Sequence, residues 1–310
     1  MSIRARLLVS TVVAGICFPP LPLLAADMVT KEAFPIFAPA VDGVNARFDG
    51  FGGSFAHQSF YGGRSSIAMP LTGQWGAQFD VIGGRMAGDS FGSLGGHLFW
   101  RDPSRGLLGL YVNHTLWNGL GGVNVTQVAP EVEVYWHRWT LQGIAGVEFG
   151  NSGTYATSTS VIPPVFPDPG LATTNFDSFD VKTRFFDQIN LKYYFTDNWA
   201  GYVGHRYLGG KNALALGSEY AMPLRPGVMG SAFVEARLGS GSFEGLWGGL
   251  RLYIGKKDKS MMARHREDDP ITWDTLFSII NSTHRNSGSS SREFCDGGGS
   301  PVQGSCEVPD

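Results

Sequence analysis

Apolar and polar residues alternate with a period of two along much of this chain. In the stretch 139–149, apolar or small residues such as Leu141 and Val147 alternate with residues that include Thr140, Gln142 and Glu148. The stretches 131–136, 228–238 and 246–254 show the same alternation. Successive side chains of a β-strand point to opposite faces, whereas a helix repeats every 3.6 residues. The pattern therefore predicts strands that have one apolar and one polar face.

The alternating stretches predict an all-β domain over residues 44–255, with about twelve strands in an antiparallel up-and-down arrangement. A strand that spans a membrane in a β-barrel needs about ten residues. Asp187 is awkward, because strict alternation would place it on the apolar face, so we expect a bulge or a rim position there. The predicted strands are 44–55, 64–70, 75–86, 91–101, 106–117, 122–136, 139–150, 179–195, 198–208, 211–222, 227–238 and 243–254.

Tryptophans stand beside every second connection between the predicted strands. Amphipathic rings are enriched at both membrane–water boundaries, where transmembrane barrels carry aromatic girdles. In a soluble β-sandwich, the alternative fold, the same rings would lie in the core. The pattern favours a transmembrane barrel with a girdle that includes Trp75, Trp100, Trp136, Trp139 and Trp199 at one rim and Trp117 at the other.

The lengths of the connections predict the orientation of such a barrel. The even-numbered connections are tight, whereas the odd-numbered ones are looser and include residues 56–63 and 151–178. Bacterial outer-membrane barrels keep short periplasmic turns and longer external loops. We therefore expect both ends of the barrel domain, and the short tail after it, to be periplasmic.

The N-terminal residues and the composition agree with export. Arg4 and Arg6 precede an apolar run, and residues 1–26 resemble a cleaved signal peptide, followed by a linker at 27–43. Charged residues make up only 16% of the chain, the mean hydropathy is −0.05, and no later stretch is apolar enough for a transmembrane helix. The net charge of −3 gives no indication of nucleic-acid binding. We expect the Gram-negative outer membrane, with its lipid and lipopolysaccharide, and assembly by the barrel-assembly machinery.

Charged residues of both signs recur on the polar face, which a barrel turns toward its lumen. One interpretation is a satisfied polar network that fills a narrow barrel, because buried charges need partners. The other is a small selective pore lined by charge. The predicted lumen-lining residues are Arg47, Asp49, Asp80, Arg101, Glu131, Glu133, Glu148, Lys182, Arg184, Glu219, Glu235, Arg237 and Arg251.

Signals for catalysis or metal binding are weak. Residues 88–92 match the G-x-S-x-G pattern around Ser90, but that motif acts on a strand-to-helix turn, and here it falls between two predicted strands. His57, His114 and His205 stand in no recognisable catalytic motif. No His/Cys spacing indicates a metal site, and we predict no cofactor.

The tail at 256–310 combines several kinds of segment. Residues 256–270 are of mixed charge and predict a solvated linker, 271–280 predict a short amphipathic helix, and 287–291 predict a flexible linker. Cys295 and Cys306 are the cysteines left after signal removal and predict a disulfide-closed loop. The helix has three possible roles: packing on the barrel base, plugging the lumen, or binding a periplasmic partner.

Four stretches carry a resemblance to a known group. Residues 97–109 (HLFWRDPSRGLLG), 70–80 (PLTGQWGAQFD) and the segments 258–260 and 264–270 resemble sequences of uncharacterised, porin-like outer-membrane barrels of alphaproteobacteria. The resemblance spans the barrel and its exit but not the region beyond Ile271. It implies an outer-membrane location and a barrel fold, and it carries no assigned activity and no catalytic residues.

Two functional hypotheses follow from these patterns. The first is a narrow porin or channel for small polar solutes, or a structural barrel of the bacterial surface. The alternative is a barrel enzyme that acts on lipid or peptide at the outer rim.

Overall fold

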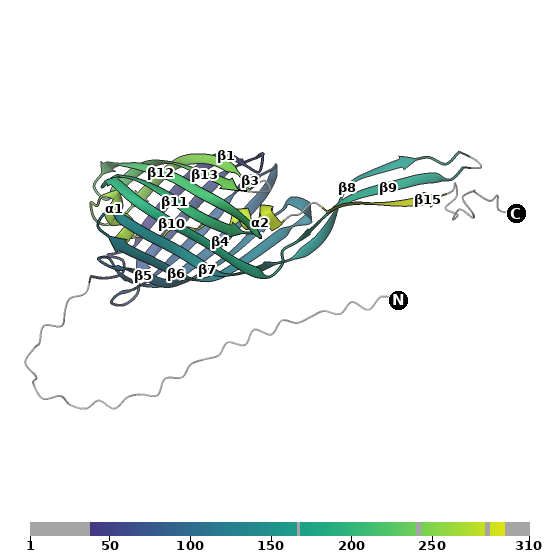
Figure 1. Ribbon diagram of the computed structural model, residues 1–310. Helices are drawn as coiled ribbons and strands as arrows, with labels where there is room; N and C mark the ends of the chain where they lie inside the picture. Colours follow the sequence, from purple (N-terminus) through teal and green to yellow (C-terminus); the bar gives the residue numbers. More distant parts are fainter. Residues whose placement is uncertain (1–37, 166–167, 240–242, 283–285, 295–310) are drawn as a thin grey trace, which may run out of the picture. The chain divides into compact units, whose positions relative to one another are not determined.

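Twelve antiparallel strands form a closed barrel in the part of the chain that the computed structural model describes, residues 38–165, 168–239, 243–282 and 286–294 (Figure 1). Each strand pairs with its neighbours, and the last pairs with the first, so the predicted fold is confirmed. The barrel strands are β1 (Asn45–Phe55), β2 (Gln58–Pro70), β3 (Trp75–Met86), β4 (Asp89–Asp102), β5 (Gly106–Trp117), β6 (Val123–Trp136), β7 (Trp139–Gly150), β10 (Arg184–Thr196), β11 (Trp199–Leu208), β12 (Lys211–Arg225), β13 (Val228–Gly239) and β14 (Gly245–Ile254).

The alternation along each strand separates an apolar outer face from a polar inner face. In β5, Leu108, Leu110 and Val112 are exposed on the outside, whereas Tyr111 and Asn113 are buried inside. Other strands expose their aliphatic and aromatic residues in the same way. This is the reverse of a soluble sandwich, whose apolar side chains would meet in the core, and it is typical of a barrel surrounded by lipid.

The two ends of the barrel differ, and we name them by the strand termini. At the base, β1 begins and β14 ends; at the mouth, β1 ends and β14 begins. The first connection at the mouth is only the two residues Ala56 and His57, because β2 starts at Gln58. The expectation of a loose connection over 56–63 is therefore wrong, and the long mouth connection is 151–183.

That long connection is not an irregular loop. It contains β8 (Ser152–Ile162) and β9 (Gly170–Asp180), and β9 also pairs with β15 (Asn286–Phe294) of the tail. Figure 1 shows these three strands side by side. Two predictions are corrected here: 151–178 is a hairpin, and 287–291 is part of a strand instead of a flexible linker. Cross-strand pairs such as Thr173 and Ser291, whose hydroxyl oxygens are 3.0 Å apart, give these Ser/Thr-rich stretches partners.

Asp187 lies on the outer face of β10, as strict alternation requires. It is the fourth residue from the mouth end of β10, and no bulge occurs there. Its Oδ1 lies 2.7 Å from Nδ1 of His205 on β11. The aspartate is thus accommodated on the outer face by a polar partner close to the rim.

The segments on either side of the barrel pack against it instead of serving as solvated linkers. Ala40 and Val41 are fully buried in a cluster with Phe99 and Leu107 at the base. After β14, the tail forms α1 (Met261–Glu267) and α2 (Leu276–Ser282), of which only the second was anticipated. The predicted signal peptide, Cys295 and Cys306 lie outside the described residues.

Candidate functional site

The tail runs through the barrel lumen from the base to the mouth. At the base, the backbone N–H of Met262 donates to the carbonyl oxygen of Asp197 at 2.9 Å, beside the first residue of α1. At the mouth, the side-chain amide of Asn281 in α2 donates to the carbonyl oxygen of Leu208 at 2.9 Å. Asp197 precedes β11 and Leu208 ends it, so the two contacts lie at opposite ends of one strand. The segment between them therefore spans the length of the barrel.

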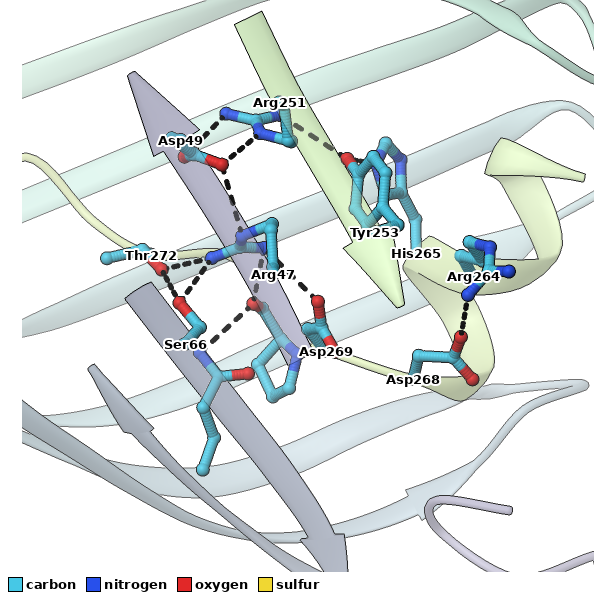
Figure 2. A network of polar contacts seen from close by, with 12 residues as sticks. Arg47, Asp49, Ser66, Arg251, Tyr253, Arg264, His265, Asp268, Asp269 and Thr272 are labelled. Atoms are coloured by element: carbon cyan, nitrogen blue, oxygen red, sulfur yellow. Dashed lines mark hydrogen bonds and ion pairs between the residues drawn. The ribbon is translucent and has the colours of Figure 1, made fainter. Parts of the chain in front are cut away.

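Arg47 of β1 holds the extended part of the tail after α1 (Figure 2). Its guanidinium donates to the carbonyl oxygen of Pro270 at 3.4 Å and to the hydroxyl of Thr272, and it lies 3.9 Å from the carboxylate of Asp269. The same guanidinium also donates to Ser66 of β2 at 3.0 Å. One buried cation thus links two strands of the wall to the tail.

Asp274 forms the strongest charged contact between the tail and the wall. Its Oδ2 accepts a hydrogen bond of 2.9 Å from Nε of Arg206 and another of 2.9 Å from Nε of Arg237. Burial alone would raise the pKa of Asp274, but the two guanidinium groups, Arg237 first, lower the pKa to about 2. Its backbone also exchanges two hydrogen bonds with the side-chain amide of Gln188. The carboxylate is therefore charged whenever the tail is in place.

Trp273 attaches the tail to a second buried cluster. Its indole N–H donates to Glu131 at 3.1 Å, and the other carboxylate oxygen of Glu131 lies 2.7 Å from Nδ1 of His97. Nε2 of the same imidazole lies 3.0 Å from Asp80. All four side chains are buried. The arrangement satisfies every polar group that the indole meets, as a buried network requires.

The second helix closes the mouth end with both polar and aromatic contacts. The hydroxyl of Ser278 donates to Glu148 at 2.7 Å and accepts from Gln127 at 2.9 Å. Phe277 stacks on Phe55 of β1 with ring centroids 4.0 Å apart. Because these partners come from opposite parts of the wall, α2 bridges the lumen at that level.

Two titratable groups of the tail have altered proton affinities because they are enclosed by the barrel. Burial raises the pKa of Asp269 to about 6, although the nearby Arg47 opposes this rise. Burial and the neighbouring cations of the wall hold the pKa of His265 well below its usual range. His265 is thus a neutral imidazole near pH 7, and its two ring nitrogens lie 3.0 Å and 2.9 Å from the hydroxyls of Tyr194 and Tyr253.

Most of the residues predicted to line the lumen do point inward, and many of them contact the tail or one another. The exception is Lys182, which follows β9, is largely exposed and pairs with Asp180 at 3.6 Å. Arg184 lies at the mouth end, 3.8 Å from Glu148. The others that point inward are Arg47, Asp49, Asp80, Arg101, Glu131, Glu133, Glu148, Glu219, Glu235, Arg237 and Arg251.

The space that remains beside the tail is small. A cavity of about 70 Å³, lined by groups that include Lys192, Glu219 and Arg251, lies against the wall of β10 to β14. One water needs roughly 10–15 Å³ of such space, so the cavity holds a few waters and is no passage for a solute.

The predicted girdle is present at the base but not in the predicted form at the mouth. Trp75, Trp136, Trp139 and Trp199 are exposed on the outside at the base, and Trp100 is paired with Trp75. Trp117 instead points inward, is 9% exposed and donates to the carbonyl oxygen of Met86 at 3.2 Å. The prediction for Trp117 is corrected: this ring belongs to the interior of the mouth. Phe91 and Phe243, which stand near the mouth ends of β4 and β14, are likewise buried.

The residues considered for catalysis are not brought together. Ser90 accepts a hydrogen bond from Asn118 at 2.6 Å, whereas His57 contacts Glu244 and His114 contacts Thr126. Among the described residues, no group of His, Cys, Asp or Glu is arranged to hold a metal ion, and no helix is long and apolar enough to cross a membrane.

The alternation of the sequence predicts which residues form the wall of the lumen, but it does not predict what those residues bind. Trp273, Asp274 and Ser278 were recognised only as parts of an amphipathic helix, because the pairing of distant charges leaves no periodic signal. Comparison with models of protein families and with curated proteins finds no match for this chain.

Proposed function

We propose that this chain is a bacterial outer-membrane barrel that its own C-terminal segment keeps closed, and that it serves as a structural barrel of the cell surface instead of an open porin. The apolar outer face, the girdle at the base and the export signal expected at 1–26 support the location. The short turns at the base support a periplasmic base and an external mouth. With this orientation β15 of the tail, which pairs with β9 at the mouth, is external, in contrast to the expectation of a periplasmic tail.

The observation that carries the proposal is the occupied lumen. The tail makes hydrogen bonds to the wall at the base, in the middle and at the mouth, and its central carboxylate, Asp274, is shared by Arg206 and Arg237. Removing one partner of a buried ion pair typically costs about 3–5 kcal/mol. Contacts of this kind along the whole segment oppose its departure, so the resting barrel should not conduct.

Conductance in a planar lipid bilayer tests this proposal. The full-length protein should give no discrete channels, whereas a variant with Trp273, Asp274 and Ser278 all changed to alanine should open, because its tail has lost its central contacts and one contact near the mouth. A matched control changes three exposed residues of β8, Thr154, Thr157 and Thr159, to alanine and should stay silent. Steady channels from the unchanged protein would contradict a barrel closed by its tail and would support the narrow-porin hypothesis instead.

The enzyme hypothesis receives no comparable support. The hydrogen-bond partner of Ser90 is Asn118, an amide that cannot act as a general base. Phospholipid hydrolysis that disappears in Ser90→Ala would nevertheless overturn the structural assignment, and the same purified protein serves for both assays.

A further inference from the structure

A large cavity opens at the mouth of the barrel, above the tail. It measures about 720 Å³, and it is lined by the mouth connections of the barrel together with β8 and α2. Ile280 of α2 lies at its inner side, and Trp117 and Tyr155 contribute aromatic rings. Small-molecule sites are concave, measure roughly 300–1,000 Å³ and combine apolar walls with a few polar groups. This mouth cavity has the size and composition of such a site.

The backbone around the mouth cavity is unusual. Among the described residues, five that are not glycine have a positive φ, and four of these, Ala56, His57, Ala87 and Leu120, line the cavity. Glycine adopts this conformation without steric cost, so other residues there indicate that the surroundings hold the backbone in place. The fifth, His137, belongs to a tight turn at the base. Ala56, His57 and Ala87 belong to two-residue hairpin turns, which require a positive φ, so these turns form a well-defined rim of the cavity.

The polar groups of the mouth cavity favour an uncharged, hydroxyl-rich ligand. Gln58 and Asp89 are exposed, and neither side chain has a hydrogen-bond partner among the described residues. A carboxylate and an amide can accept and donate hydrogen bonds to hydroxyl groups. Among the described residues that line the cavity, Asp89 is the one carboxylate and Lys211 is the one ammonium group. Their charges balance, so a multiply charged ligand would lack counter-charges.

The aromatic groups favour the same ligand class. Tyr155 is 47% exposed and its ring rests on Gly121, where a Cβ would come within 3.3 Å of the ring. Trp117 is fixed at its indole N–H by the carbonyl oxygen of Met86 and is packed against Gly119. The buried ring of Trp117 thus forms part of the cavity floor, whereas the ring of Tyr155 is exposed to the cavity. An exposed amphipathic ring suits a ligand with C–H faces and a polar edge, as a sugar has.

We propose that the mouth cavity is a binding site for a neutral oligosaccharide, held by the exposed ring of Tyr155 and by the side chains of Gln58 and Asp89. This inference goes beyond the closed barrel, because binding at the mouth requires no passage through the lumen. A conductance result that contradicted closure would leave the binding measurement unaffected.

Binding of the full-length, detergent-folded protein to an array of neutral di- to pentasaccharides tests the proposal. The protein should bind at least one of them. Asp89→Asn and Tyr155→Ala should each weaken that binding about tenfold or more, because a charged hydrogen bond or a ring face is lost. Tyr155→Phe keeps the ring and should bind nearly as well. Asp168→Asn, an exposed aspartate of the β8–β9 connection, is the matched control and should have no effect.

A second arm distinguishes a free sugar from one attached to lipid. Phosphatidylethanolamine vesicles with and without an uncharged diglycosyl glycolipid are compared for binding to the same variants. Preference for the vesicles with the neutral glycolipid, lost in Asp89→Asn, would identify the lipid-linked sugar as the ligand. No binding in either arm, binding of acidic glycans alone, or equal binding by Asp89→Asn and Tyr155→Ala would overturn the proposal.

Discussion

Replacing Asp274 by alanine should loosen the tail within the lumen. The carboxylate is shared by Arg206 and Arg237, whose side chains are almost fully buried, so its loss leaves two guanidinium groups without their main counter-charge. Removing one member of a buried charge cluster typically costs about 3–5 kcal/mol. Since each 1.4 kcal/mol is about tenfold in an equilibrium constant, the tail should open roughly a hundred- to several thousandfold more often.

Amide hydrogen exchange in residues 271–282, followed by mass spectrometry, measures that opening directly. Exchange of protected amides reports the free energy of local opening, so the rate in Asp274→Ala should rise by the same factor while the barrel strands stay protected. Asp168→Ala removes an exposed aspartate and is the matched control. Changing Arg206 to methionine in the Asp274→Ala background should restore part of the protection, because it removes a buried guanidinium whose counter-charge was Asp274. Equal exchange in the wild type and Asp274→Ala would refute the assignment of Asp274 as the central attachment.

Three further predictions follow from the tail. The pKa of Asp269 is raised to about 6 from its ordinary 3.8, so the folded state binds the proton of this carboxyl more tightly than the unfolded state does. The contribution of Asp269 to tail stability is therefore present at low pH and is lost as pH rises from about 4 to about 6. Hydrogen exchange of wild type and Asp269→Asn at pH 4 and 7 should show this difference, and parallel pH profiles of the two proteins would count against it. If the mouth is external, a maleimide reagent that does not cross membranes should label Ser290→Cys of β15 on intact cells. The same reagent should label Ser104→Cys of the base only after the membrane is permeabilised. The opposite pattern would reverse the proposed orientation. Cys295 and Cys306 should form a disulfide, so intact-mass measurement after alkylation should find both blocked without reductant, and full alkylation would show that the bond is absent.

The strands of the barrel could be predicted from the sequence because their cause is local. Each strand must present apolar residues to one side and polar residues to the other, so apolar and polar residues alternate along its sequence. The tight turns at the base follow from short polar segments such as 103–105 and 137–138, and these also agree with the structure. The inward direction of Glu131 or Arg237 follows from the same alternation and needs no knowledge of their partners.

The prediction is wrong for two residues, Lys182 and Trp117. Lys182 follows β9 and lies outside the barrel strands. The alternation along a barrel strand therefore does not determine the direction of its side chain. Trp117 has the right spacing for a girdle, but parity along β5 turns it inward, where it meets the carbonyl oxygen of Met86. A girdle residue must stand at the height of the rim and also point outward, and Trp117 meets only the first condition.

Only the tertiary structure decided what fills the lumen and what stands at its mouth. The sequence by itself determined a twelve-stranded barrel with a charged interior and an amphipathic tail, but a charged interior suits an open pore as well as a filled one. Asp274 meets Arg206 and Arg237 across 68 and 37 residues of chain, and contacts at such separations depend on how the closed barrel positions its strands. Local patterns encode the direction of a side chain, whereas the partner of a buried charge is set by the fold as a whole.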